Sequence, residues 1–207
     1  MSSIRFIYFD LGNVLLNFDH GIACARIAAG GSRSEQEVDQ LIFGSGLQNR
    51  FESGEIAGDR FAQQVAVDTG WQAEPSELLE ICSDIFDLNA AIVPVVAHLK
   101  AAQHRLGILS NTCSAHWDWV YGGRYSILRG TFEQLVLSYE VGAMKPARSI
   151  YDAAIAAAGV PAEAIFFTDD REENVAGALA AGIDATLFRG TQALIDDLRA
   201  RGIRCNI

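Results

Sequence analysis

Acidic side chains follow two apolar stretches that lie far apart in the sequence. Asp169 and Asp170 come directly after the run 164–168, Ala-Ile-Phe-Phe-Thr, and Asp10 comes after the run 4–9, Ile-Arg-Phe-Ile-Tyr-Phe. Both runs have the length and composition of buried strands. In a parallel sheet the carboxyl ends of such strands face a shared crevice, so the three carboxylates can build one anionic site. This kind of site suits a hard divalent cation with oxygen ligands and leaves room for a phosphate.

Two further loops carry groups that suit a phosphate. The strand-like run 105–109 leads into Ser110 and Asn111, which place a hydroxyl and an amide where a helix can begin, with free backbone N–H groups. Lys145 precedes Pro146, which bars helix at position 145 and suits the start of a helix beyond it. The ammonium group of Lys145 can therefore reach a site built from loops.

Taken in order, these positions resemble the four motifs of the haloacid dehalogenase superfamily of aspartyl-nucleophile phosphohydrolases. The resemblance spans nearly the whole chain, and each motif falls at a predicted strand end or in the loop that follows. Four motifs in this order are a specific signal. They are Asp-Leu-Gly-Asn-Val at 10–14, Ser110-Asn111, Lys145-Pro146, and Asp169-Asp170 with downstream Asn174.

The resemblance implies a catalytic role for several of these side chains. Asp10 is the implied nucleophile, which attacks phosphorus, forms an aspartyl phosphate and is regenerated by water. Mg²⁺ is the implied cofactor, bound by Asp10, the backbone carbonyl of Gly12, and Asp170. Asp169 is implied to hold Lys145 or a metal-bound water. Two acids beside a third also need a cation to offset their repulsion, which is a separate argument for Mg²⁺.

The transferring phosphoryl group needs hydrogen bonds and positive charge, because its catalysis is mainly positioning and electrostatics. Ser110, Asn111 and Lys145 are predicted to supply them. Alone, Ser110 would be an ordinary helix cap and Lys145 a surface lysine. Asn174 lies one turn beyond Asp170 and is placed to orient it, with a solvent-facing side chain as the alternative.

The order of the predicted elements indicates the fold class. Strand-like runs recur at 4–10, 105–110, 134–138, 164–168 and 184–188. Helical stretches are predicted near 93–103, 114–128, 147–158 and 171–181. Right-handed crossovers then give a three-layer, doubly wound parallel α/β core formed by 1–16 and 91–207.

Residues 17–90 interrupt this alternation. Helices are predicted there near 34–43, 59–68 and 75–86, separated by turns that contain Gly. The superfamily resemblance implies that this segment is a small α-helical cap domain, which covers the active site and contributes substrate contacts; a helical pair that only stabilises the core is the alternative. For His20, Arg50 and Glu52 within it, ordinary surface roles are favoured over substrate contacts.

Composition limits the possible partners. The chain has 207 residues, half of them hydrophobic, enough for one substantial core and a small accessory unit. The net charge of −10 argues against nonspecific nucleic-acid binding and gives no attraction to anionic lipid. No run reads as a signal peptide or could span a bilayer, so a cytoplasmic location without membrane contact is expected. The oligomeric state is not encoded in any pattern.

Gly12 departs from the superfamily pattern. Most phosphatases of the superfamily carry a second Asp two positions after the nucleophile, which protonates the leaving group and deprotonates water. Dehalogenase members also lack that acid, so haloacid dehalogenation is one alternative; however, those relatives need no metal and usually replace the acids found here at 169 and 170. A catalytically weak protein that only binds a phosphate ligand is the other alternative.

The sequence therefore predicts an Mg²⁺-dependent hydrolase of a small phosphate monoester, a sugar phosphate for preference. The segments 10–14 and 51–56 resemble bacterial sugar-phosphate phosphatases of the glucose-1-phosphate phosphatase type. Without an acid at Gly12, negative charge accumulates on the leaving oxygen unless water or another side chain supplies a proton. Sugar 1-phosphates, acyl phosphates and aryl phosphates are then the expected substrates.

Overall fold

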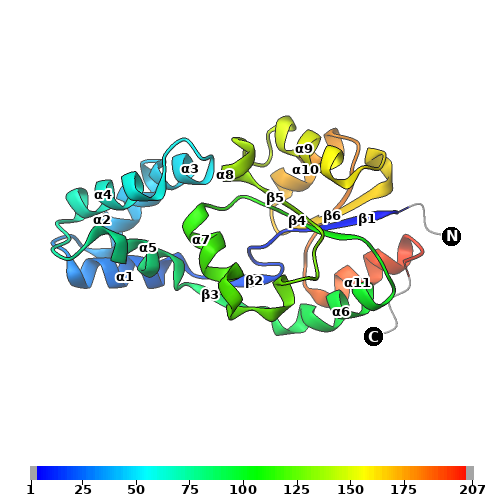
Figure 1. The fold of residues 1–207 in the computed structure, drawn as a ribbon, viewed down its shortest axis with the longest axis horizontal. Helices are drawn as coiled ribbons and strands as arrows, with labels where there is room; N and C mark the ends of the chain where they lie inside the picture. Colours follow the sequence, from blue (N-terminus) through cyan, green and yellow to red (C-terminus); the bar gives the residue numbers. More distant parts are fainter. Residues whose placement is uncertain (1–3, 204–207) are drawn as a thin grey trace.

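A five-stranded parallel sheet forms the centre of the molecule (Figure 1). The computed structural model describes residues 4–203. Each strand joins its neighbours in parallel, in the order β5-β4-β1-β6-β7. The strands are β1 (Phe6–Phe9), β4 (Leu106–Ser110), β5 (Gln134–Leu137), β6 (Ile165–Asp169) and β7 (Asp184–Leu187). The predicted doubly wound α/β fold is thereby confirmed.

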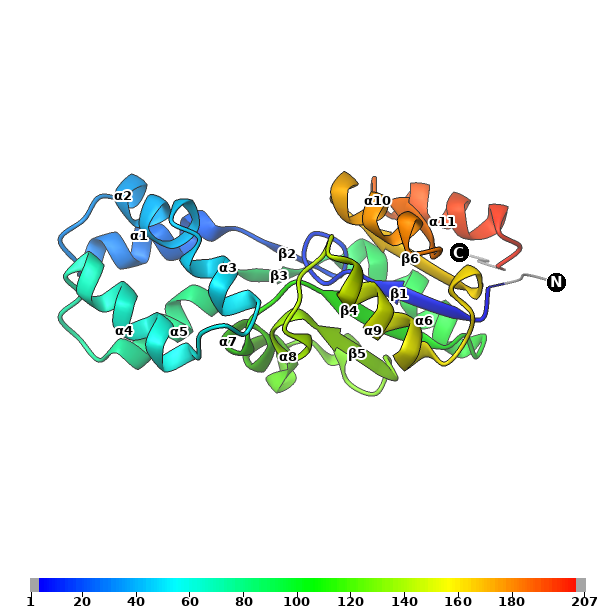
Figure 2. The ribbon, with the colours of Figure 1, turned by 90° about the horizontal axis from the view of Figure 1, so that it is seen from above.

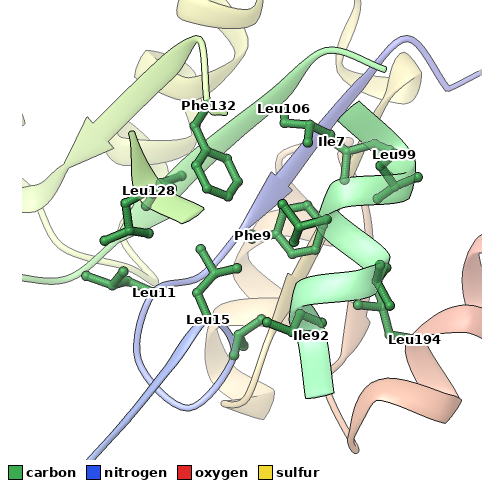
Figure 3. Close-up of a cluster of buried hydrophobic side chains, with 14 of the residues drawn as sticks. Ile7, Phe9, Leu11, Leu15, Ile92, Leu99, Leu106, Leu128, Phe132 and Leu194 are labelled. Atoms are coloured by element: carbon green, nitrogen blue, oxygen red, sulfur yellow. The ribbon is translucent and has the colours of Figure 1, made fainter. Parts of the chain in front are cut away.

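Helices cover both faces of this sheet, which is why its central strands are apolar along their whole length. One face packs against α6 (Val93–Ala101) and α11 (Thr191–Ala200), and the other against α9 (Arg148–Ala158) and α10 (Glu172–Ala180). Side chains of β1 alternate between the two faces. Ile7 and Phe9 point into the first layer, beside Leu99 of α6 and Leu194 of α11 (Figure 3).

A helical segment, residues 20–83, lies beyond one end of the sheet in both views (Figures 1 and 2). It has an apolar core of its own that includes Phe51, Phe61 and Leu78. Its elements are α1 (His20–Gly30), α2 (Glu35–Asp39), a π-helical turn (Gln40–Gly44), α3 (Leu47–Glu52), α4 (Gly58–Thr69) and α5 (Pro75–Ser83). The domain boundaries at 17 and 90 stay a prediction.

Two short strands that the sequence did not predict flank the helical segment. β2 (Leu16–Phe18) and β3 (Phe86–Leu88) pair antiparallel and carry the chain into and out of it. Each has three residues, too few to show the alternation of apolar and polar side chains that identifies a strand in a sequence.

The predicted helix 114–128 is interrupted in the structure. α7 (Ser114–Trp119) passes into a π-helical turn (Val120–Arg124), where Gly123 has a φ of 111°, and then into a 3₁₀ turn (Ser126–Leu128). The left-handed backbone that Gly123 permits ends the helix there. The remaining short elements are the helix α8 (Ser138–Val141) and 3₁₀ turns at Ala90–Ile92 and Ala162–Ala164. Between residues 4 and 203 no helix is long and apolar enough to cross a membrane.

Gly107, in the middle of β4, tests how closely the sheet and its helical layer fit. A Cβ atom at Gly107 would lie 2.4 Å from a ring carbon of Tyr8 and 2.8 Å from one of Phe6. We expect Gly107→Ala to lower the free energy of unfolding by about 1–3 kcal/mol, because both rings are buried and must shift. Urea unfolding measures this, with Gly122→Ala as control, since a Cβ there meets no atom within 4 Å. Equal losses in the two variants would contradict the prediction.

Candidate active site

Three carboxylates meet where β1 and β6 end. Phe9 pairs with Thr168 in the sheet, so Asp10 and Asp169 are the next residues on adjacent strands. Asp170 follows directly. One oxygen from each of these three aspartates lies within 4.8 Å of the other two. The structure thus brings together the acids that the sequence placed at two separate strand ends.

Lys145 provides a positive charge inside this cluster. Its Nζ lies 2.9 Å from Asp10 Oδ1 and 2.5 Å from Asp169 Oδ2, and it donates a hydrogen bond of 3.0 Å to the carbonyl of Leu109. Burial opposes the charge on Lys145, but Asp10 and Asp169 outweigh it and raise the pKa of the ammonium group. Burial raises the pKa of Asp10 to about 7, although Lys145 acts in the opposite direction.

Asn111 holds the backbone of Lys145 in place. The N–H of Lys145 donates to Asn111 Oδ1 at 2.7 Å, and Asn111 Nδ2 donates to the carbonyl of Lys145 at 3.0 Å. The side chain of Asn111, in the loop after β4, therefore fixes the position of the Lys145 backbone. Sequence reasoning assigned Asn111 to substrate alone and missed this positioning contact.

Asp169 and Asp170 have different surroundings. Asp169 is fully buried and accepts hydrogen bonds of 2.9 Å from Asn174 Nδ2 and from the backbone N–H of Arg171. Asp170 is partly exposed and accepts 2.9 Å from Asn13 Nδ2. The expectation that Asn174 orients Asp170 is wrong. Asn174 binds Asp169 instead, because Asp169, the last residue of β6, points its side chain toward the first turn of α10.

A pocket of about 360 Å³ lies between the carboxylates and the helical segment. Its sheet side is formed by residues that include Asp10, Gly12, Asn111, Lys145, Asp170 and Asn174. Its other side is formed by His20, Phe43, Gln48, Asn49 and Glu52. A smaller cavity of about 50 Å³ adjoins it and is bordered by Gly12, Phe18, Glu52, Ser110 and His116 among others.

Some sequence expectations about the helical segment change here. His20 and Glu52, for which surface roles were favoured, both line the pocket. Arg50 does have a surface role, since it pairs with exposed Glu55 at 2.8 Å and does not line this pocket. Ser110 borders only the smaller cavity, and its hydroxyl lies 3.3 Å from the carbonyl of Asn111.

An aromatic ring lies next to Gly12, on the side where a side chain would point. A Cβ atom at Gly12 would lie 2.7 Å from Phe18 Cε1. The ring of Phe18 is in turn 4.8 Å from the ring of His20 and 6.0 Å from that of Phe86, centroid to centroid. An acid at position 12 would require this aromatic group to move.

The family model of haloacid dehalogenase-like hydrolases matches residues 4–182. The chain belongs to this family. It is 26% identical over 178 residues to D-ribitol-5-phosphate phosphatase of Bacteroides thetaiotaomicron, an alignment that covers 83% of this chain and 85% of that protein.

Solved structures agree with the family assignment. A HAD family enzyme from Bacteroides thetaiotaomicron, in complex with magnesium and inorganic phosphate, has a TM-score of 0.79 and 25% identity over 89% of this chain and 93% of that one. A predicted HAD-like family hydrolase from Porphyromonas gingivalis has a TM-score of 0.80 and 25% identity over 96% of this chain and 99% of that one.

Replacing Lys145 by Met tests the charge balance of the cluster. Removing one partner of a buried ion pair costs about 3–5 kcal/mol, so we expect a loss of that size in the free energy of unfolding at about pH 8 in EDTA. The loss should shrink toward about pH 5. Lys145 holds the pKa of Asp10 down, so without the ammonium group that pKa rises further in the folded state. The folded variant then binds more protons than the unfolded variant and gains stability as pH falls.

Urea unfolding at both pH values measures this effect. Lys100→Met serves as the control, because Lys100 is exposed and donates only to the carbonyl of Thr131 at 3.2 Å among the bonds described. If Lys145→Met lowered the free energy of unfolding by the same amount at both pH values, the ammonium group would not balance the charge of the carboxylates.

Proposed function

We propose that the chain is an Mg²⁺-dependent phosphohydrolase that cleaves a small phosphate monoester, a sugar phosphate, through an aspartyl phosphate on Asp10. The observation that carries this proposal is the convergence of Asp10, Asp169 and Asp170 with Lys145 at one side of the pocket below the helical segment. The similarity to a D-ribitol-5-phosphate phosphatase, and to a family structure that holds magnesium and inorganic phosphate, supports it.

The donor atoms of the cluster fit Mg²⁺. The cluster holds three carboxylates and one ammonium group, which pairs with Asp10 and Asp169, so it keeps an excess of negative charge that a divalent cation would offset. All the donors are hard oxygens, which Mg²⁺ prefers. Asp10, Asp170 and the backbone carbonyl of Gly12 would hold the ion. When bound, Mg²⁺ supplies positive charge next to the anionic phosphate.

The residues of the cluster then divide the work of phosphoryl transfer. A carboxylate oxygen of Asp10 attacks phosphorus as the ester P–O bond breaks, and water later releases phosphate and restores Asp10. Lys145 lowers the electrostatic cost of bringing an anionic phosphate to an anionic nucleophile. Asp169 and Asn111 hold Lys145 there, by its side chain and by its backbone. Asn111 lines the pocket and offers a hydrogen bond to the phosphoryl oxygens, whereas the same role for Ser110, at the smaller cavity, stays a prediction.

The nucleophile is tested with Asp10→Asn. An amide is a far poorer nucleophile than a carboxylate, so we expect Mg²⁺-dependent release of phosphate from p-nitrophenyl phosphate to fall by at least about 10³-fold. Circular dichroism should show an unchanged fold. Asp152→Asn, at an exposed aspartate of α9 that pairs with Arg148, should keep wild-type activity. Near-wild-type turnover by Asp10→Asn, once contaminating phosphatases are excluded, would refute the assignment.

Metal dependence is a separate expectation. EDTA should abolish phosphate release and Mg²⁺ should restore it, whereas Ca²⁺ should substitute poorly because its larger and looser coordination misplaces the attacking carboxylate. Halide release from a 2-haloacid, measured in parallel, distinguishes the dehalogenase alternative. Full phosphatase activity in excess EDTA would contradict the metal proposal, and metal-independent halide release would favour a dehalogenase.

A further inference from the structure

Cleavage of an alkyl phosphate requires a proton for the leaving oxygen, and Gly12 cannot provide one. The ring of Phe18 lies where a side chain at position 12 would begin. The sequence left open whether water or another side chain acts instead. The pocket itself contains few candidates.

Besides Asp10, Asp170 and Lys145, four titratable or cationic groups line the pocket or the adjoining cavity. They are His20, Glu52, His116 and Arg171. Arg171 pairs with Glu173, and a guanidinium group does not give up its proton in proteins. Burial lowers the pKa of His116 to about 4 and also lowers the pKa of His20, so burial disfavours the proton-donating form of both imidazoles, whereas it favours the protonated form of a carboxyl. Glu52 is the remaining candidate.

We propose that Glu52 is the proton donor to the leaving group and, in the second half of the reaction, the base that accepts a proton from water. The inference rests on the phosphohydrolase function proposed above and names a catalytic residue for it.

The position of Glu52 fits this role. It is the last residue of α3, and it borders both the pocket that contains Asp10 and the small cavity that contains Gly12 and Ser110. It therefore faces the region next to the nucleophile from the side opposite the sheet. The side chain is oriented by Gln48, whose Nε2 donates to Glu52 Oε1 at 2.9 Å.

Two contacts fix the backbone at Glu52 against the sheet side of the pocket. Ser138 Oγ lies 2.6 Å from the carbonyl of Glu52 and 3.0 Å from that of Thr112, and it accepts the N–H of Thr112 at 2.9 Å. Gly54, with a φ of 74°, packs so closely on α8 that a Cβ atom would lie 2.3 Å from the carbonyl of Tyr139. Figures 1 and 2 both show α3 beside α8.

The electrostatic surroundings favour a protonated carboxyl. Burial raises the pKa of Glu52, and the hydrogen bond from Gln48 and the positive charges of Arg171 and Lys145 only partly oppose it. The other charged or titratable groups of the pocket are Asp10, Asp170 and His20. A carboxyl with a raised pKa keeps its proton more readily than an ordinary carboxyl, and it can both donate that proton and accept it back.

The reaction balances with this single donor. As the bond between Asp10 and phosphorus forms and the ester P–O bond breaks, the carboxyl proton of Glu52 passes to the leaving oxygen, giving a neutral alcohol and the Glu52 carboxylate. In the second half, water attacks phosphorus and the bond to Asp10 breaks. The Glu52 carboxylate takes a proton from that water, so both side chains return to their starting states.

The test compares wild type with Glu52→Gln, using kcat/KM in Mg²⁺ over phosphate esters that range from acyl and nitrophenyl phosphates to simple alkyl phosphates. General acid catalysis contributes roughly 10²–10⁴-fold, so we expect Glu52→Gln to lose about 10²-fold or more on alkyl phosphates. On acyl and nitrophenyl phosphates, whose leaving groups need no proton, the loss should stay below about fivefold. In wild type, kcat/KM should depend only weakly on the pKa of the leaving group. The absence of an acid at Gly12, taken alone, predicts instead a strong preference for good leaving groups.

The control is Glu55→Gln, three residues away, where the exposed carboxylate pairs with Arg50 outside the pocket. It should match wild type on every ester. Glu52→Gln can keep the bond from Gln48, because its amide oxygen also accepts. In wild type, kcat/KM for alkyl phosphates should fall at alkaline pH as Glu52 loses its proton, and this fall should be absent with nitrophenyl phosphates. This second measurement needs no variant.

The outcomes separate the two proposals. If Glu52→Gln lowered kcat/KM equally on all esters, or on none, the role of Glu52 would be overturned and the proposed phosphohydrolase function would stand. A fall of wild-type kcat/KM at alkaline pH on all esters, nitrophenyl phosphates included, would also overturn the role of Glu52. Absence of Mg²⁺-dependent turnover of every ester by wild type would instead overturn the function itself.

Discussion

The placement of Lys145 between Asp10 and Asp169 is the interaction on which the rest of the site depends. An ammonium group and two carboxylates, all buried, are costly to remove from water, and their mutual attraction repays this only when the geometry is good. Several features supply that geometry. β1 and β6 are neighbours in the sheet, the carbonyl of Leu109 accepts from Nζ, and Asn111 fixes the backbone beside the lysine. The loops after three strands are thereby held in one arrangement.

Much of this arrangement could be predicted from the sequence. The core strands are apolar runs that end in polar groups, and parallel pairing places such ends at one edge. Asp10, Asp169 and Asp170 could therefore be expected at a single site, and the superfamily resemblance added Lys145 from the loop before Pro146. The three carboxylates follow from the order of the elements alone, and the family match covers residues 4–182, which include all of them.

The remaining features depend on orientation and on short elements. The sequence spacing of Asn174 does not determine which of two adjacent aspartates it contacts. β2 and β3 are too short to show a period, yet they bring Phe18 over Gly12. The position of Glu52 depends on the packing of α3 against α8, between segments 86 residues apart, which no local pattern encodes. Two signals were available: Gln48 and Glu52 lie four residues apart on one helix, and Glu52 belongs to the segment 51–56 that resembles sugar-phosphate phosphatases.

The helical segment is attached to the rest of the molecule in two unequal ways. On one side α5 packs on α7, with Cys113 buried in the apolar core of the segment and His116 bonded to the carbonyl of Cys82 at 3.1 Å. On the other side the hydroxyl of Ser138 bridges Glu52 and Thr112. Water can replace a hydroxyl bridge more easily than an apolar contact. Opening of the pocket to solvent would therefore begin at α3 and would carry Glu52 away from Asp10.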